Sequence, residues 1–312
     1  MKNKSLILLI IALMLGINAY SQNTFAQINT VSASPYIPQS VEWGGEKIEL
    51  DRYDMRERFD REMISFCYGH TNTLLVIKRA NRFFPILKPI LEEMGVPEDF
   101  LYLAVIESSL NPKAQSPAKA AGLWQIMPTT AKEFGLEVNA DVDERYNIVK
   151  STRAACKYLK KAYEKYGSWL TAAASYNAGQ NRITTEMASQ LQNHAFDLWL
   201  NEETSRYMFR LMAIKMIMES PVHYGFAIRT SQLYSPIRFK EIEVKSSIND
   251  LSQFALEYGI SYSQLKDFNM WLRSRKLPVK EGNSYMILIP FIEDLFYTTN
   301  AQGVYDKRWV ID

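Results

Sequence analysis

Histidine and cysteine are scarce in this 312-residue sequence, which contains three histidines and two cysteines. His70, His194 and His223 are far apart, so no pair of them has the spacing of a zinc site. The sequence also lacks the Gly-x-Ser-x-Gly turn of serine esterases and any glycine-rich loop that could hold a phosphate. These absences argue against a zinc enzyme, an esterase of that type and a nucleotide-binding protein, and we expect neither a metal nor a cofactor.

One acidic segment begins like a calcium-binding loop but lacks what such a loop requires. The run Asp141-Val-Asp143-Glu-Arg145 has neither the third oxygen ligand nor the glycine of that motif. We therefore expect Asp143 and Arg145 to form a structural ion pair or a cap.

Long apolar runs are absent beyond the first residues, so no later stretch approaches the roughly 17 to 25 residues that a spanning helix needs. At the start, two lysines precede the apolar run Leu6 to Leu15, and Ala19 and Ser21 suit the small-residue rule for cleavage. We therefore predict a signal peptide over residues 1–21 and no transmembrane span after its removal. Because no cysteine lies near this site, we expect no lipid anchor.

Neither sign of charge dominates the sequence, which has 36 basic and 34 acidic residues. Loss of Lys2 and Lys4 with the signal peptide leaves the chain neutral, which does not suit a nucleic-acid binder that must neutralise phosphates. With 47% hydrophobic residues, the chain can bury a core and is not disordered.

The hydrophobic pattern predicts a mainly α protein with a small α+β module near its end. Polar residues with scattered proline and glycine over residues 22–50 predict a linker arm. Helical periodicity predicts one domain over residues 51–235, with long helices at 51–68, 72–94, 147–166 and 202–219. Two strands at 239–244 and 285–289, which flank short helices at 251–258 and 263–269, predict a module over 236–291 and a C-terminal tail over 292–312.

Glu107 ends an apolar stripe on a predicted helix. Phe100, Leu103 and Ala104 lie seven, four and three residues before it and share its face. A poorly solvated carboxyl has a raised pKa, and an acid that stays protonated near neutral pH can donate a proton to a leaving group. The alternative is a solvated glutamate at a helix end.

No second acid lies near Glu107 in the sequence, because Ser108 to Lys132 contains neither Asp nor Glu. Asp99, eight residues upstream, would lie about 12 Å away along a helix. Glycosidases that use two carboxylates hold them roughly 5 to 9.5 Å apart. Locally Glu107 is therefore an acid without a partner, although a carboxylate from elsewhere in the chain could fold toward it.

The run from Glu107 to Leu136 resembles the signature of the soluble-lytic-transglycosylase family, most closely its membrane-bound type D branch. The matching elements are Glu107-Ser108, Asn111-Pro112, Ala114, Ser116, Gly122-Leu123-Trp124-Gln125, Met127-Pro128, Thr130-Ala131 and Phe134-Gly135-Leu136. The family's second element, a Tyr-Asn pair that closes a helix of small residues, matches Tyr176-Asn177 within Ala172 to Gly179. The resemblance implies a lysozyme-like helical domain.

The resemblance also implies an activity. Such an enzyme cleaves the β-1,4 bond between N-acetylmuramic acid and N-acetylglucosamine in peptidoglycan, with Glu107 as general acid and then base, and closes a 1,6-anhydro ring. Peptidoglycan strands would be the partner, the periplasm the location and a monomer the expected state. Two alternatives remain open: a goose-type muramidase on the same fold, and a non-catalytic peptidoglycan-binding scaffold.

Five further residues are expected at the site through the resemblance. Ser116 and Gln125 would bind the sugar or its N-acetyl group, or would instead cap the loop. Met127 would line the cleft or pack in the core. Tyr176 would place its hydroxyl near Glu107 and orient it, and Asn177 would contact the sugar or fix the loop. Trp124 is expected to pack in the core.

The region 236–291 resembles a LysM module, a fold that binds glycans containing N-acetylglucosamine. The matching positions are Leu251, Ala255, Tyr258-Gly259, Leu265, Asn269, Gly282 and Ile289-Pro290. The usual Gly-Asp-Thr-Leu turn is replaced by Ser247 to Leu251, and Trp271 to Lys280 forms an extended loop. The module is expected either to bind glycan or to act as a structural cap.

Overall fold

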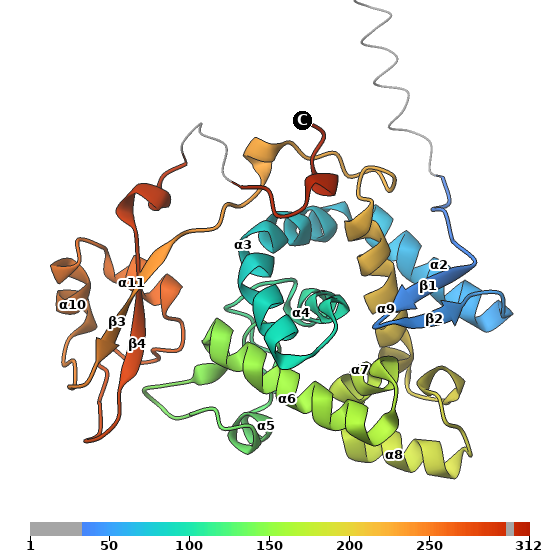
Figure 1. Ribbon diagram of the computed structural model, residues 1–312, viewed down its shortest axis with the longest axis horizontal. Coiled ribbons are helices and arrows are strands. Elements are labelled where there is room, and N and C mark those ends of the chain that lie inside the picture. Colours follow the sequence, from blue (N-terminus) through green and yellow to red (C-terminus); the bar gives the residue numbers. More distant parts are fainter. Residues whose placement is uncertain (1–32, 298–302) are drawn as a thin grey trace, which may run out of the picture. The chain divides into compact units, whose positions relative to one another are not determined.

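The computed structural model describes residues 33–297 and 303–312, and residues 37–312 form one compact unit (Figure 1). The predicted signal peptide, residues 1–21, lies outside the described residues. In the described part of the chain, no helix is both long and apolar enough to cross a membrane.

Helices dominate the described residues up to about position 235, as the periodicity predicted. The long helices are α2 (Tyr53–Tyr68), α3 (His70–Met94), α6 (Ile148–Tyr166) and α9 (Glu202–Glu219). The shorter helices are α4 (Leu101–Ser108), α5 (Pro128–Glu133), α7 (Trp169–Ala178) and α8 (Gln180–Ser189). Short 3-10 helices are η1 (Glu98–Phe100), η2 (Glu144–Tyr146), η3 (Ala195–Asp197), η4 (Thr230–Gln232), η5 (Ile292–Leu295) and η6 (Lys307–Trp309).

Residues expected to form a linker arm form a β-hairpin instead. Strand β1 (Ser40–Trp43) pairs in antiparallel fashion with β2 (Glu46–Glu49). The Trp43 side chain is fully buried, and its ring lies edge-on to Phe100 at 5.8 Å between centroids. The linker prediction is therefore wrong for residues 40–49, because burial of one large aromatic side chain anchors a segment whose composition is mostly polar.

The short helix α4 lies inside the helical domain, where it packs against α3 and α9 (Figure 1). Leu103 and Ala104 of α4, and Phe100 just before it, have no exposed surface. The apolar stripe that precedes Glu107 in the sequence is thus a buried face, and its contacts fix the direction in which the helix presents its C-terminal end.

The C-terminal part contains the predicted order of strand, helix, helix and strand. Strand β3 (Phe239–Val244) pairs in antiparallel fashion with β4 (Tyr285–Pro290), and α10 (Leu251–Glu257) and α11 (Tyr262–Phe268) lie between them in the chain. Asn269 is fully buried and satisfies both backbone groups of Leu288, accepting from its N–H at 2.8 Å and donating to its carbonyl at 2.7 Å. The predicted fold class, a helical domain followed by an α+β module, is confirmed.

The described end of the chain returns to the helical domain. Trp309 is 2% exposed, and its indole N–H donates to the Met218 carbonyl at 2.7 Å. The segment expected to be a tail thus contributes an aromatic side chain to the core. The two cysteines, Cys67 and Cys156, are both buried and free.

Candidate active site

Glu107 lies in the last turn of α4 and keeps part of its surface exposed. Burial of the carboxyl is the main cause that raises its pKa to about 7, and the charge of Glu203 adds to the rise. A hydrogen bond from Tyr207 and the charge of Arg210 act in the opposite direction. Because its pKa lies near 7, a large fraction of Glu107 is protonated at neutral pH.

Tyr207 on α9 is the direct partner of Glu107. Its hydroxyl donates a hydrogen bond to Oε1 of Glu107 at 2.5 Å. Burial and then the neighbouring charge of Glu107 raise the pKa of Tyr207 well above its ordinary value, so the phenol remains a donor. Tyr207 is 3% exposed on α9, which packs against α2, α4 and α7, and this burial restricts the direction of the hydrogen bond.

The expectation that the Tyr176 hydroxyl orients Glu107 is wrong. That hydroxyl donates to the backbone carbonyl of Trp124 at 2.7 Å, and the ring lies edge-on to Tyr158. Tyr176 is nevertheless near the acid, because burial and then the charge of Glu107 raise its pKa. The phenol has a single O–H, which it donates to the Trp124 carbonyl. The hydrogen-bond donor to Glu107 therefore comes from α9 instead.

Sequence reasoning missed Tyr207 because it lies in an apolar run between Arg206 and Arg210 and resembles a core residue. One signal was available: a buried tyrosine hydroxyl needs a hydrogen-bond partner, and a helix with so many apolar side chains supplies none. That signal indicates that Tyr207 has a hydrogen-bond partner but does not identify it, because Glu107 is 100 positions away in the chain.

Asn177 joins the end of α7 to the first turn of α9. Its Oδ1 accepts from the Thr204 hydroxyl at 2.8 Å, and its Nδ2 donates to Glu203 Oε1 at 3.4 Å. Asn177 therefore holds the turn that carries Glu203, the carboxylate whose charge reaches Glu107. Its side chain fixes the structure around the site.

Ser116 and Gln125 hold the loop of residues 111–127, which we call the substrate loop. The Ser116 hydroxyl oxygen accepts from the Ala120 N–H, and the Gln125 amide nitrogen donates to the carbonyls of Ala114 and Gly122. Among the described residues, the Ser116 O–H and the Gln125 side-chain oxygen have no hydrogen-bond partner, so both remain available to a ligand.

Met127 and Trp124 take opposite positions at the end of this loop. Met127 is 40% exposed directly before α5, whereas Trp124 is fully buried and donates from its indole nitrogen to Thr152 at 2.8 Å. Trp124 therefore packs in the core, as expected. Met127 presents its side chain outward, where a ligand could contact it.

The backbone around the site adopts left-handed conformations at residues other than glycine. Ser109, Leu110 and Gln125 have φ values of 51°, 53° and 46°. Such conformations are unfavourable by about 1 to 3 kcal/mol each and persist where their surroundings hold them. Ser108 supplies one restraint, because its hydroxyl donates to the Leu123 carbonyl at 2.8 Å and joins the end of α4 to the substrate loop.

Arg145 holds the other side of the substrate loop. Its guanidinium forms two hydrogen bonds with the Asp143 carboxylate and donates to the carbonyls of Lys119 and Ile126 at 2.6 and 3.1 Å. Arg145 is 4% exposed and Asp143 is 7% exposed. The predicted structural pair is confirmed, and a buried ion pair in which Arg145 uses four of its five N–H donors is costly to break.

The C-terminal module packs against the segment that carries this pair. The Asp143 N–H donates to the Trp271 carbonyl at 2.8 Å, and the Arg273 N–H donates to the Asp141 carbonyl at 2.7 Å. The Arg273 guanidinium also lies over the Tyr146 ring, 4.3 Å from its centroid. The extended loop of the module is therefore a structural support of the segment that fixes the substrate loop.

No group of three or more His, Cys, Asp or Glu side chains that could hold a metal ion occurs in the described ranges, 33–297 and 303–312. The chemistry available at the site is that of one protonated carboxylic acid, a phenol that donates to it, and a loop with free polar atoms. Such a set can transfer a proton to a leaving group.

Two known families match the sequence. Residues 85–197 match the transglycosylase SLT domain, and residues 240–292 match the soluble lytic transglycosylase C-terminal LysM-like domain. The first match contains Glu107, the substrate loop and Tyr176, and it ends before Tyr207.

Curated relatives agree with these matches. Membrane-bound lytic murein transglycosylase D of Escherichia coli (strain K12) is 28% identical over 245 residues, which cover 77% of this chain and 52% of the relative. The soluble lytic murein transglycosylase of the same organism is 32% identical over 96 residues, 29% of this chain and 15% of that protein. The chain thus spans about half the length of the first relative.

Among solved structures, the 70-kDa soluble lytic transglycosylase of Escherichia coli aligns with a TM-score of 0.39 and 22% identity, over 53% of this chain and 29% of that one. The family resemblance predicted from the sequence is confirmed by the family matches and the curated relatives. The chain therefore contains a transglycosylase SLT domain followed by a LysM-like C-terminal domain, and it is homologous to membrane-bound lytic murein transglycosylase D and to the soluble lytic transglycosylases.

Proposed function

We propose that this protein is a peptidoglycan lytic transglycosylase that cleaves the β-1,4 bond between N-acetylmuramic acid and N-acetylglucosamine without consuming water. One observation carries the proposal: the carboxyl of Glu107 has a pKa raised to about 7 and accepts a fixed hydrogen bond from Tyr207. A group of this kind is protonated and oriented at the pH at which it must donate.

The reaction proceeds in two steps. Glu107 transfers its proton to the glycosidic oxygen, the bond from that oxygen to the muramyl C1 breaks, and the N-acetylglucosamine side leaves as an alcohol. The substrate's own N-acetyl oxygen stabilises the positive charge at C1. The muramyl C6 hydroxyl oxygen then bonds to C1, and its proton returns to the Glu107 carboxylate. The product is a 1,6-anhydro sugar, and the acid is regenerated.

Tyr207 changes its contribution between these steps. Its hydrogen bond to Glu107 strengthens when the carboxyl becomes anionic, because a donor to a charged oxygen binds about twice as strongly as one to a neutral oxygen. The hydrogen bond from Tyr207 therefore stabilises the carboxylate that forms as the glycosidic bond breaks. Burial of that carboxylate favours its return to the protonated form. Tyr207 positions the acid, and Glu107 carries out the proton transfers.

Substrate binding is assigned to the free polar atoms of the substrate loop and to α7. Ser116 and Gln125 would hydrogen-bond the sugar or its N-acetyl group, and the exposed Met127 would contact the apolar face of the ring. Tyr176 and Asn177 would line the site from α7, where both already fix neighbouring segments.

Hydrolysis is the second candidate reaction, because Glu203 adds a carboxylate whose charge influences Glu107. In a goose-type muramidase, such a group could activate a water molecule on the opposite face of the sugar. We favour the transglycosylase reaction because Asn177 engages Glu203 and the homologues named above are lytic transglycosylases.

The products of digested peptidoglycan sacculi test the proposal. Mass spectrometry is expected to find 1,6-anhydro-muramic ends, which lack one water relative to reducing ends. The Glu107→Gln variant keeps the side-chain shape without the acid, and it is expected to release no fragments while still binding sacculi. Reducing ends would identify a muramidase, and binding without any release by the parent protein would identify a non-catalytic scaffold. Unchanged release by Glu107→Gln would show that Glu107 is not the acid.

Further features of the organisation are part of the proposal. We propose a signal peptide over residues 1–21, a catalytic domain over 51–235 and a LysM-like module over 236–291 that contacts glycan. Export to the periplasm would bring the enzyme to its substrate, and a monomer suffices for the chemistry described.

A further inference from the structure

A cavity of about 460 Å³ lies where the helical domain meets the LysM-like module. We call it the junction cavity. Its walls come from α3, the start of the substrate loop, the start of α6, the connection of residues 234–239, and α11. Glu107 is not among the residues that line it, so the cavity is distinct from the candidate active site.

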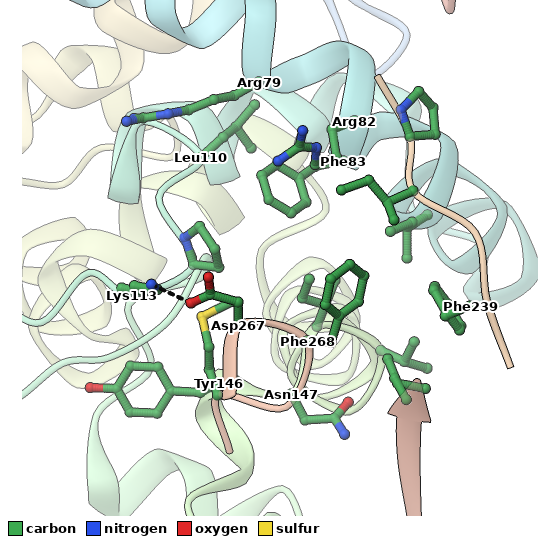
Figure 2. Close-up of a pocket in the computed structure, with 18 of the residues that line it drawn as sticks. Arg79, Arg82, Phe83, Leu110, Lys113, Tyr146, Asn147, Phe239, Asp267 and Phe268 are labelled. Carbon is green, nitrogen blue, oxygen red and sulfur yellow. Dashed lines mark hydrogen bonds and ion pairs between the residues drawn. The ribbon is translucent and has the colours of Figure 1, made fainter. Parts of the chain in front are cut away.

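Most of the cavity wall is apolar. Figure 2 shows Phe83 and the guanidinium of Arg82 on one side of the cavity, with Phe268 and Asp267 across from them. Leu110 also lines the space. A sugar or a peptide backbone bound here would leave several hydroxyl, N–H or carbonyl groups without partners, which is unfavourable in a site of this kind. An apolar body fits the wall.

The charges at the cavity are mainly positive. Arg79, Arg82 and Lys113 line it together with one carboxylate, Asp267. Lys113 and Asp267 pair with each other at 2.5 Å, whereas neither Arg79 nor Arg82 forms an ion pair with any residue that the structure describes. The cavity thus presents two uncompensated guanidinium groups.

Arg82 is fixed in position while most of its donors remain free. Its Nε donates to the Ser235 carbonyl at 2.9 Å, and its guanidinium lies 5.7 Å from the centre of the Tyr234 ring. An arginine has five N–H donors, and only one of those of Arg82 is used in the described residues. A preorganised guanidinium is suited to bind a carboxylate or a phosphate through two parallel hydrogen bonds.

We propose that the junction cavity binds a small anionic amphiphile, a molecule with one apolar chain or ring system and a single carboxylate or phosphate group. The apolar part occupies the space between Phe83, Leu110 and Phe268, and the anionic group pairs with Arg82. This site is independent of the proposed peptidoglycan chemistry. Because its walls come from both domains, the bound molecule links the module to the helical domain.

Titration calorimetry with three twelve-carbon probes tests the proposal on the full chain without its signal peptide. The probes are dodecanoate, dodecyl phosphate and dodecyltrimethylammonium, each used below its micelle concentration. We expect saturable binding at one site for at least one anionic probe and none for the cationic probe. The two anionic arms show which head group the site takes.

Variants locate the site. Arg82→Gln is expected to lower the affinity for the anionic probe about tenfold, which corresponds to the loss of one charge-assisted hydrogen bond. Arg56→Gln is the matched control, because Arg56 is exposed on α2 and does not line the cavity. Ile237→Trp is expected to fill the cavity and abolish binding. Val149→Trp lies at a 40% exposed position on the rim of the cavity. It is expected to block binding as well, and a larger side chain at an exposed position disturbs folding less.

The proposal is overturned if neither anionic probe binds, if the cationic probe binds equally well, or if both filling variants fold and still bind. Equal weakening by Arg82→Gln and Arg56→Gln would also overturn it, because it would show that only the overall charge of the protein matters.

Discussion

The hydroxyl of Tyr207 lies 2.5 Å from Oε1 of Glu107 and donates a hydrogen bond to it, across 100 positions of sequence. Burial and this hydrogen bond have opposite effects on the pKa of Glu107, and burial has the larger effect, since the pKa is raised to about 7. Burial of Glu107 therefore favours its protonated form. The Tyr207 hydroxyl fixes the orientation of the carboxyl and favours its anionic form.

Replacement of Tyr207 by phenylalanine removes the hydroxyl and keeps the ring. Because the lost bond lowers the pKa of Glu107, the alkaline limb of activity should move to higher pH. Turnover should fall by about 10- to 100-fold, since one hydrogen bond to a charged group contributes roughly 1.5 to 3 kcal/mol. The measurement is kcat for release of anhydro products as a function of pH.

Tyr176→Phe is the matched control for that experiment. Its hydroxyl donates to the Trp124 carbonyl, so its removal should leave the alkaline limb in place. A shifted limb in Tyr176→Phe together with an unshifted one in Tyr207→Phe would exchange the two roles assigned here.

Glu107→Gln should stabilise the protein at alkaline pH. The pKa of Glu107 is raised from 4.5 to about 7, so between these values the folded state holds a proton that the unfolded state has released. Stability from this group is fully present below pH 4.5 and is lost as pH rises through 7. Glutamine does not titrate, so its advantage should grow by about 1 to 3 kcal/mol between pH 5 and pH 8.

Urea unfolding of both proteins at these two pH values measures that difference. A free energy of unfolding that differs between variant and parent by the same amount at pH 5 and pH 8 would mean that the folded state does not raise the pKa of Glu107.

Glu203→Gln separates the two candidate reactions. The charge of Glu203 raises the pKa of Glu107, so its removal should move the alkaline limb to lower pH while anhydro products continue to form. Glu202→Gln is the control, because the neighbouring Glu202 pairs with Arg61 and is not among the groups that shift the pKa of Glu107. Loss of all product release in Glu203→Gln alone would instead indicate that Glu203 activates water.

Gly122→Ala should disrupt the substrate loop much more than Gly135→Ala. Both glycines have positive φ, 79° and 82°, so both substitutions introduce about 1 kcal/mol or more of backbone strain. A Cβ at Gly122 would also lie 2.1 Å from the Arg145 carbonyl oxygen, whereas nothing lies within 4 Å of a Cβ at Gly135.

We expect the additional clash at Gly122 to cost at least another ~2 kcal/mol, within the range for an overpacked site. Thermal unfolding of the two variants measures the difference. Equal destabilisation would show that the contact between Gly122 and Arg145 does not restrain the loop.

Local pattern in the sequence was sufficient for the helices and the module. The apolar repeats of α2, α3, α6 and α9 predicted these helices closely, because an amphipathic helix shows its buried face in its own residues. A serine before a helix is a common cap, and the Ser168 hydroxyl accepts from the Thr171 N–H at the start of α7. The alternation over β3 was likewise visible in the chain.

The hairpin of β1 and β2 could not be predicted in this way. Four-residue strands show too few alternations to distinguish from a polar linker, and their stability comes from the burial of Trp43 against Phe100. Lys215 adds hydrogen bonding from α9, as its ammonium donates to the Glu42 carbonyl at 2.8 Å. These contacts join segments that are more than 50 residues apart, and no local pattern contains them.

The sequence by itself determined that Glu107 ends an apolar helix face and that no acid follows it for 25 residues. It also predicted that Asp143 and Arg145 form a structural pair or a cap, and the structure shows the pair. Only the tertiary structure decided which hydroxyl reaches the acid, which carboxylate influences it, and where the cavity between the domains lies. Periodicity and helix caps depend on neighbours along the chain, so they could be predicted from the sequence. The placement of Tyr207, Tyr176 and Glu203 near Glu107 depends on how α4, α7 and α9 pack, which is set by many side-chain contacts at once.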